Sequence, residues 1–143
     1  MLVQNIKVAA DSMIFYKNGA HLQLLLVKRK FDPFKGMWAL PSGFVEDDEE
    51  LEAAALRELR EETGLILTRI KQLHTFGKVG RDPRGRTVSV TYYAILTEKQ
   101  TVAGGDDAAE AHWVNVPDIT EMAFDHKEVL AVALEALGAE LKG

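Results

Sequence analysis

The run from Leu22 to Arg29 is almost continuously apolar, and it is the feature that most constrains the fold. A strand of this kind is buried on both faces, so both sides of its sheet must be covered. Two segments with helix-forming patterns, residues 50–63 and 125–141, supply that cover. Further predicted strands are residues 8–16, 87–97, 112–116 and one strand or two short ones within 65–78. The order strands, helix, strands, helix predicts an α/β (α+β) sandwich with a mixed sheet between helices.

Composition restricts the class of protein. The 143 residues are enough for one domain, and 47% hydrophobic with 27% charged residues is typical of a globular chain. The chain has no cysteine, which excludes a disulfide framework, a thiolate zinc site and a cysteine nucleophile. The 22 acidic and 17 basic residues disfavour a general nucleic-acid binder. The sequence shows no membrane span or secretion signal, so we expect one domain over residues 1–143 in the cytoplasm.

The first predicted helix places carboxylates where a solvated helix would not. Glu58 and Glu62 point in nearly the same direction as Leu51 of the apolar stripe, and Glu61 lies beside them. Acidic residues near a helix C-terminus are opposed by the helix dipole, and neighbours at this spacing repel each other. A salt-bridged surface helix with an Arg57–Glu61 pair explains neither the direction nor the position. A bound Mg²⁺ or Mn²⁺ explains both, because these cations prefer oxygen ligands.

The segment GFVEDDEELEAAALRELREETGL, residues 43–65, resembles the Nudix box at every specified position. The preceding LLLVKRKFDPFKGMWALPSGFVE also resembles the family, although Ser42 stands where many members have glycine. The resemblance implies a Nudix α/β/α sandwich in which the box forms a loop, a helix and a loop. It also implies a metal-dependent hydrolase that cleaves a nucleoside diphosphate linked to another group.

The resemblance assigns roles to residues of the box. The implied ligands of Mg²⁺ (or Mn²⁺) are Glu58, Glu61 and Glu62, with a further ligand from the carbonyl of Gly43. Supporting roles within the motif fall to Glu49, which acts through a coordinated water, to Arg57, which orients carboxylates, and to Gly64, which caps the helix.

The general base is left open between two places. Glu62 or Glu58 of the box could accept the proton of the attacking water. In several family members the base lies on a separate loop, and the candidate here is AGGDDAAEA with Asp106, Asp107 and Glu110. An acidic surface turn explains this loop equally well.

Two features bear on the substrate. The loop RDPRGR brings together Arg81, Arg84 and Arg86, whose guanidinium groups suit phosphate oxygens, although an exposed hairpin explains them too. The segment FGKVGRDPRGRTVSVTYYAIL resembles ADP-ribose pyrophosphatases and the Nudix-related regulators that sense ADP-ribose. Aromatic residues that could stack on a base are Phe31, Phe34, Trp38, Phe76 and Tyr92. Phe34 completes the predicted substrate-binding set.

The sequence therefore predicts hydrolysis of ADP-ribose to AMP and ribose 5-phosphate. Two alternatives stay open: hydrolysis of another nucleotide, such as an oxidised triphosphate, a nucleotide sugar or a dinucleotide, and an ADP-ribose sensor without catalysis. The chain ends at Gly143, soon after the last helix, so we expect no added DNA-binding domain. The expected partner is a small nucleotide, and neither nucleic acid nor membrane is expected. The resemblance also implies a homodimer.

Overall fold

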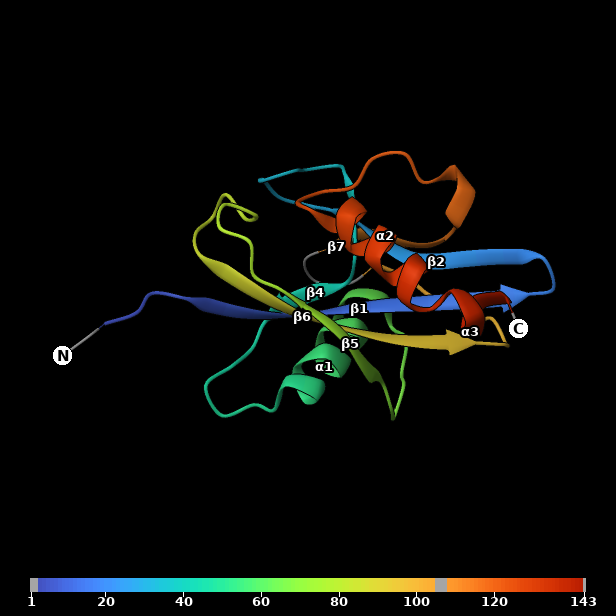
Figure 1. The fold of residues 1–143 in the computed structure, drawn as a ribbon, viewed down its shortest axis with the longest axis horizontal. Helices are drawn as coiled ribbons and strands as arrows, with labels where there is room; N and C mark the ends of the chain where they lie inside the picture. Colours follow the sequence, from blue (N-terminus) through green and yellow to red (C-terminus); the bar gives the residue numbers. More distant parts are fainter. Residues whose placement is uncertain (1–2, 105–107, 143) are drawn as a thin grey trace.

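The computed structural model describes residues 3–104 and 108–142 (Figure 1). Within these residues, seven strands form one mixed sheet, with α1 against one face and α2 and α3 against the other. The strands are β1 (Lys7–Asn18), β2 (His21–Arg29), β3 (Trp38–Ala39), β4 (Ser42–Phe44), β5 (Lys71–Phe76), β6 (Thr87–Leu96) and β7 (Ala108–Asn115). The helices are α1 (Leu51–Thr63), α2 (His126–Ala136) and α3 (Gly138–Lys142), with a 3-10 turn at Val116–Asp118. The predicted sandwich is confirmed.

The sheet has the strand order β3-β2-β1-β6-β5, with β4 paired to β1 and β7 paired to β2. The pair β1–β6 is parallel, and the other pairs are antiparallel. The antiparallel pairing of β4 with β1 places Gly43 opposite Ala10 and Ser42 opposite Asp11. The start of the predicted Nudix box is therefore held by the central strand of the sheet.

Alternate side chains of β1 point into two hydrophobic cores. Ala10 and Ile14 pack with Ala55 and Leu59 of α1, whereas Met13 and Phe15 pack with α2. The run in β2 divides in the same way: Leu25 enters the α1 core, and Leu24 and Leu26 enter the α2 core. Burial of the run on both faces is the property that the sequence predicted.

Several local expectations differ from the structure. β7 begins at Ala108 instead of residue 112, so Glu110 belongs to a strand rather than a loop, and residues 65–78 contain the single strand β5. Asp125 directly precedes α2, where aspartate is a preferred capping residue, but its side chain makes no capping bond. Both of its carboxylate oxygens instead accept hydrogen bonds from Arg81, at 2.7 and 2.9 Å.

No helix in the described part of the chain is long and apolar enough to cross a membrane.

Candidate functional site

The helix α1 brings its carboxylates next to the short strand β4. Ala54, Ala55 and Leu59 are fully buried against β1, and the Ser12 hydroxyl donates to the carbonyl of Ala55 at 3.3 Å. The helix ends at Gly64, whose φ of 76° is left-handed and whose N–H bonds to the helix at 2.9 Å. This conformation favours glycine. Packing and cap together fix which carboxylates face β4.

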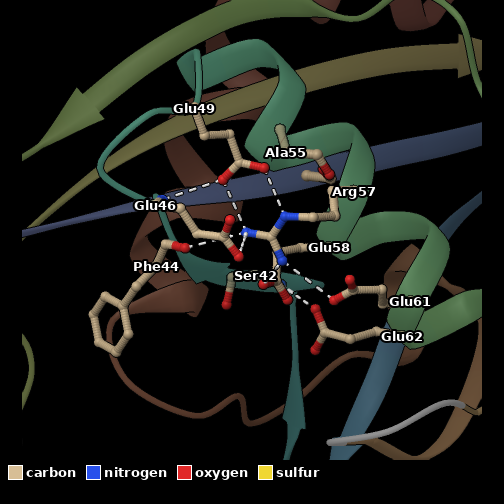
Figure 2. Close-up of polar contacts among 10 residues, drawn as sticks. Ser42, Phe44, Glu46, Glu49, Ala55, Arg57, Glu58, Glu61 and Glu62 are labelled. Atoms are coloured by element: carbon tan, nitrogen blue, oxygen red, sulfur yellow. Dashed lines mark hydrogen bonds and ion pairs between the residues drawn. The ribbon is translucent and has the colours of Figure 1, made fainter.

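Arg57 lies at the centre of the acidic residues (Figure 2). Its Nε and Nη2 donate to the two carboxylate oxygens of Glu49 at 2.6 and 2.9 Å. Its Nη1 donates to Glu58 Oε1 at 2.7 Å and to Glu61 Oε2 at 3.2 Å. The hydrogen bonds from Arg57 lower the pKa of Glu49, and those to Glu49 raise the pKa of Arg57. Arg57 thus orients three carboxylates and compensates part of their repulsion.

Glu58 and Glu62 meet the backbone of β4 at close range. The Ser42 N–H donates to Glu62 Oε2 at 2.9 Å, and Glu62 is only 7% exposed. The Glu58 carboxylate lies against Gly43, in the space that a Cβ at this position would fill. Only glycine permits this approach without displacing the carboxylate. The loop and the end of α1 are therefore fitted to each other.

These residues border a cavity of about 460 Å³. Its lining includes Glu58 and Glu62, three arginines (Arg29, Arg57 and Arg84), and Phe31, which is 57% exposed. A cavity with acidic groups, guanidinium groups and an exposed ring suits an anionic ligand that carries a flat group and a bound cation.

The three arginines of the predicted substrate loop lie in different surroundings. Arg84 lines the cavity, and its guanidinium lies 4.9–5.0 Å from the ring centres of Phe44 and Phe124. Arg81 is buried, with only 4% of its side chain exposed. Arg86 is partly buried, and its Nη1 has no hydrogen-bond partner among the described residues. The structure therefore places Arg84 at the cavity, but it does not bring Arg81 and Arg86 there.

Asp82 fixes the guanidinium of Arg84. Its carboxylate accepts from Nε and Nη2 of Arg84, at 3.1 and 2.9 Å. Burial acts to raise the pKa of Asp82, but the hydrogen bonds and charge of Arg84, together with the charge of Arg81, hold the pKa below its usual range. This ion pair holds Arg84 in one place beside the cavity.

Three other predicted site residues, Glu61, Phe34 and Glu110, are not part of this cavity lining, and Glu61 bonds to Arg57 instead. Phe34 has a φ of 62°, packs on Phe124 with ring centres 4.8 Å apart, and borders a shallower neighbouring pocket. The Glu110 carboxylate lies 2.7 Å from His112 Nε2, and its side chain is about half exposed. The remaining candidates, Asp106 and Asp107, lie outside the described residues.

The donor set fits a hard divalent cation. Glu58, Glu61 and Glu62 would supply carboxylate oxygens, and Gly43 lies against the Glu58 carboxylate. Among residues 3–104 and 108–142, no three acidic or histidine side chains already converge as a ligand set. Arg57 draws Glu58 and Glu61 to itself, so ligation requires these carboxylates to turn.

Sequence reasoning missed Arg29. It is the last residue of β2, its Nε donates to the carbonyl of Pro33 at 2.7 Å, and its guanidinium lies 4.9 Å from the ring centre of Phe124. The sequence signal was its place at the end of a buried strand next to the loop that precedes the box. Only the pairing of strands shows that this end opens on the carboxylates.

Comparison with known proteins identifies the family. The model of the NUDIX domain matches residues 6–133. An ADP-ribose pyrophosphatase of Methanocaldococcus jannaschii is 41% identical over 123 residues, which cover 86% of this chain and 70% of that protein. The ADPR responsive transcriptional repressor NtrR of Acinetobacter baylyi is 36% identical, over 91% of this chain but 54% of the repressor.

A solved structure agrees with this result. The NUDIX domain of Shewanella oneidensis NrtR, in complex with ADP ribose, superposes with a TM-score of 0.87 at 34% identity. The match covers 94% of this chain and 90% of that domain. With a matching family model, similar relatives and the same fold, this chain belongs to the Nudix family.

Proposed function

We propose that this protein is a Nudix hydrolase that uses a divalent cation to cleave the pyrophosphate of ADP-ribose into AMP and ribose 5-phosphate. The observation that carries the proposal is the cavity in which the box carboxylates Glu58 and Glu62 stand with Arg29 and Arg84. The relatives named for ADP-ribose support the choice of substrate. This chain spans 70% of the length of the pyrophosphatase and 54% of the length of the repressor.

Glu58, Glu61 and Glu62, with the carbonyl of Gly43, would hold Mg²⁺ or Mn²⁺. A divalent cation of this kind neutralises diphosphate oxygens and makes a bound water more acidic. Arg57 keeps the carboxylates oriented through its bonds to Glu49, Glu58 and Glu61.

The cavity supplies groups for the rest of the substrate. Arg29 and Arg84 line it and would bind phosphate oxygens, and Phe31 offers an exposed ring for the adenine. Glu62 or Glu58 would accept the proton of the attacking water, since both border the cavity. Glu110 is a weaker candidate for the base because its carboxylate contacts His112.

A turnover panel tests the substrate. Purified protein with Mg²⁺ is assayed against ADP-ribose, an oxidised deoxynucleoside triphosphate, a nucleotide sugar other than ADP-ribose, and a dinucleotide. We expect the highest kcat/KM for ADP-ribose. A higher kcat/KM for any other member of the panel would overturn the choice of substrate but keep the hydrolase.

The second candidate function is a sensor that binds ADP-ribose without cleaving it. The 36% identity to a transcriptional repressor favours this alternative. The retained carboxylates Glu58, Glu61 and Glu62 favour catalysis. Calorimetric binding of ADP-ribose with Mg²⁺ present and no AMP formed would establish the sensor.

A further inference from the structure

A second cluster of charged residues lies on the α2 side of the sheet, next to β4. Arg81 is its centre: Nε and Nη2 donate to Asp125, and Nη1 donates to Ser89 at 2.8 Å. Asp11 of β1 and His126 of α2 are fully buried in the same cluster. The proposed hydrolysis uses none of these side chains.

Asp11 is not required to satisfy Arg81. Asp125 and Ser89 already accept from three nitrogens of the Arg81 guanidinium. The positive charge of Arg81 acts to lower the pKa of Asp11. Nevertheless, Asp11 Oδ2 has no hydrogen-bond partner among the described residues. A buried carboxylate without full pairing is costly, which argues for a purpose beyond packing.

Asp11 stands directly opposite Ser42 in the pairing of β1 with β4. Side chains at directly opposed positions of an antiparallel pair lie on the same face, within contact distance. The Ser42 hydroxyl accordingly faces the Asp11 carboxylate, and it opposes the rise in the pKa of Asp11 that burial causes. The peptide N–H of the same Ser42 donates to Glu62 Oε2 at 2.9 Å.

A short chain of contacts therefore joins the buried cluster to the end of α1: Asp11, the hydroxyl and peptide N–H of Ser42, and Glu62. We propose that Asp11 is a positioning residue, which fixes the Ser42 peptide from the α2 side of the sheet so that Glu62 keeps its orientation for a divalent cation. The inference rests on the proposed function, because it assumes that Glu62 is a cation ligand.

The physical reason is that groups hydrogen-bonded to a metal ligand set its direction. Replacing such a partner commonly weakens metal binding or activity by about 10–100-fold. Glu62 is 7% exposed, and its Oε2 already accepts from the Ser42 N–H. A shift of that peptide would turn the carboxylate away from Glu58.

A titration of the full chain with Mn²⁺, without substrate, tests the proposal. Electron paramagnetic resonance measures the free ion at each step. We expect Asp11→Ala to weaken Mn²⁺ binding several-fold, which is less than the roughly 10–100-fold effect of losing a group bonded directly to a ligand, because Asp11 acts on Glu62 through Ser42. Ser89→Ala is the matched control, because it removes another partner of the same buried cluster without facing Ser42. We expect it to lower the melting temperature while Mn²⁺ affinity stays within about twofold.

Two further variants keep the test decisive if Asp11→Ala fails to fold. Ser42→Ala keeps the N–H that reaches Glu62 but removes the hydroxyl that faces Asp11, and we expect several-fold weaker Mn²⁺ binding. Asp11→Asn keeps an acceptor oxygen and should recover most of the affinity lost in Asp11→Ala.

The outcomes separate this inference from the proposed function. Wild-type affinity in Asp11→Ala or Ser42→Ala would overturn the positioning role, as would an equal loss in Ser89→Ala. Absence of Mn²⁺ binding by the wild-type protein would overturn the proposed cation site and, with it, this inference. Saturating Mn²⁺ should restore much of the turnover of Asp11→Ala, which a merely structural defect would not allow.

Discussion

Gly43 has no side chain, and the Glu58 carboxylate lies in the space that a Cβ would fill. The clash in Gly43→Ala is with the flexible end of Glu58 and not with backbone, so the carboxylate moves and the fold remains. We predict a loss of about 10²-fold in kcat/KM with less than about 1 kcal/mol of lost stability, measured by turnover and by urea unfolding.

Gly77→Ala is the control for this prediction. A Cβ at Gly77 meets only Val88 Cγ2 at 3.8 Å, an ordinary contact. It should leave turnover unchanged. Equal activity in Gly43→Ala and Gly77→Ala would show that the place of the Glu58 carboxylate does not matter.

Asp11 links stability to pH. Burial raises its pKa from 3.8 to about 7, so the folded protein binds more protons than the unfolded chain between these values. The Asp11 contribution to the free energy of unfolding therefore falls as pH rises from about 4 to 7, by at most about 4 kcal/mol. Asp11→Asn lacks this fall, so its stability relative to the wild type should rise over that range.

Urea unfolding of both proteins at several pH values checks this difference. His126 acts in the opposite direction, because burial lowers its pKa from 6.5 to about 4 and stability then rises with pH between these values. Its contribution is present in both proteins and cancels in the comparison. A difference that stays constant from pH 4 to 7 would show that Asp11 is not buried as an acid.

At the scale of elements, periodicity predicted what local sequence determines. The helix α1 was predicted at residues 50–63 and is found at Leu51–Thr63, because helix formers and a capping glycine specify it locally. The strands β3 and β4, with two and three residues, lie between the apolar run ending at residue 29 and the helix predicted from residue 50, where the sequence pattern predicts no strand. Their pairing depends on partners far along the chain, so no local pattern reveals them.

Polar residues predicted local structure less reliably than the apolar periodicity did. Aspartate is favoured as the residue before a helix, but the Asp125 carboxylate accepts hydrogen bonds from Arg81, far away in the sequence, and does not cap α2. Thr87, Ser89 and Thr91 alternate along β6, and all three are buried although they are polar. A long-range ion pair can thus outweigh a local capping preference.

The cap of α1 gives a prediction at this scale. Gly64 has a φ of 76°, so Gly64→Ala should lower the free energy of unfolding by about 1 kcal/mol. Gly138→Ala is the control, because this residue begins α3 without a positive φ and with open space around it. The control should be neutral or slightly stabilising in urea unfolding. Equal stabilities of the two variants would contradict the cap.

At the scale of the whole molecule, the cavity is made by segments that the sequence cannot bring together. The box predicted Glu58 and Glu62 as site residues. Such a motif can be recognised in a sequence because its residues are close together along the chain. Arg29 at the end of β2 and Arg84 in the loop before β6 reach the same cavity only through the order of the strands. Composition and spacing hold no information on that convergence.

Arg29 yields a prediction that depends on this assembly. If its guanidinium binds a phosphate oxygen, Arg29→Ala should lower kcat/KM for ADP-ribose by about 10–100-fold, as expected for a lost charged hydrogen bond. Lys28→Ala is the control on the same strand, since its amine lies over the ring of Trp38 and it does not line the cavity. Matching steady-state kinetics for the two variants would remove Arg29 from the site.

The most direct test of the account is to follow ADP-ribose by chromatography with the wild-type protein and with Glu62→Gln. With Mg²⁺, the wild type should form AMP and ribose 5-phosphate in equal amounts, and a chelator should stop the reaction. Glu62→Gln should be slower by at least about two orders of magnitude, because it removes a ligand charge. Failure of the wild type to form AMP, or an unchanged rate in Glu62→Gln, would contradict the proposed site.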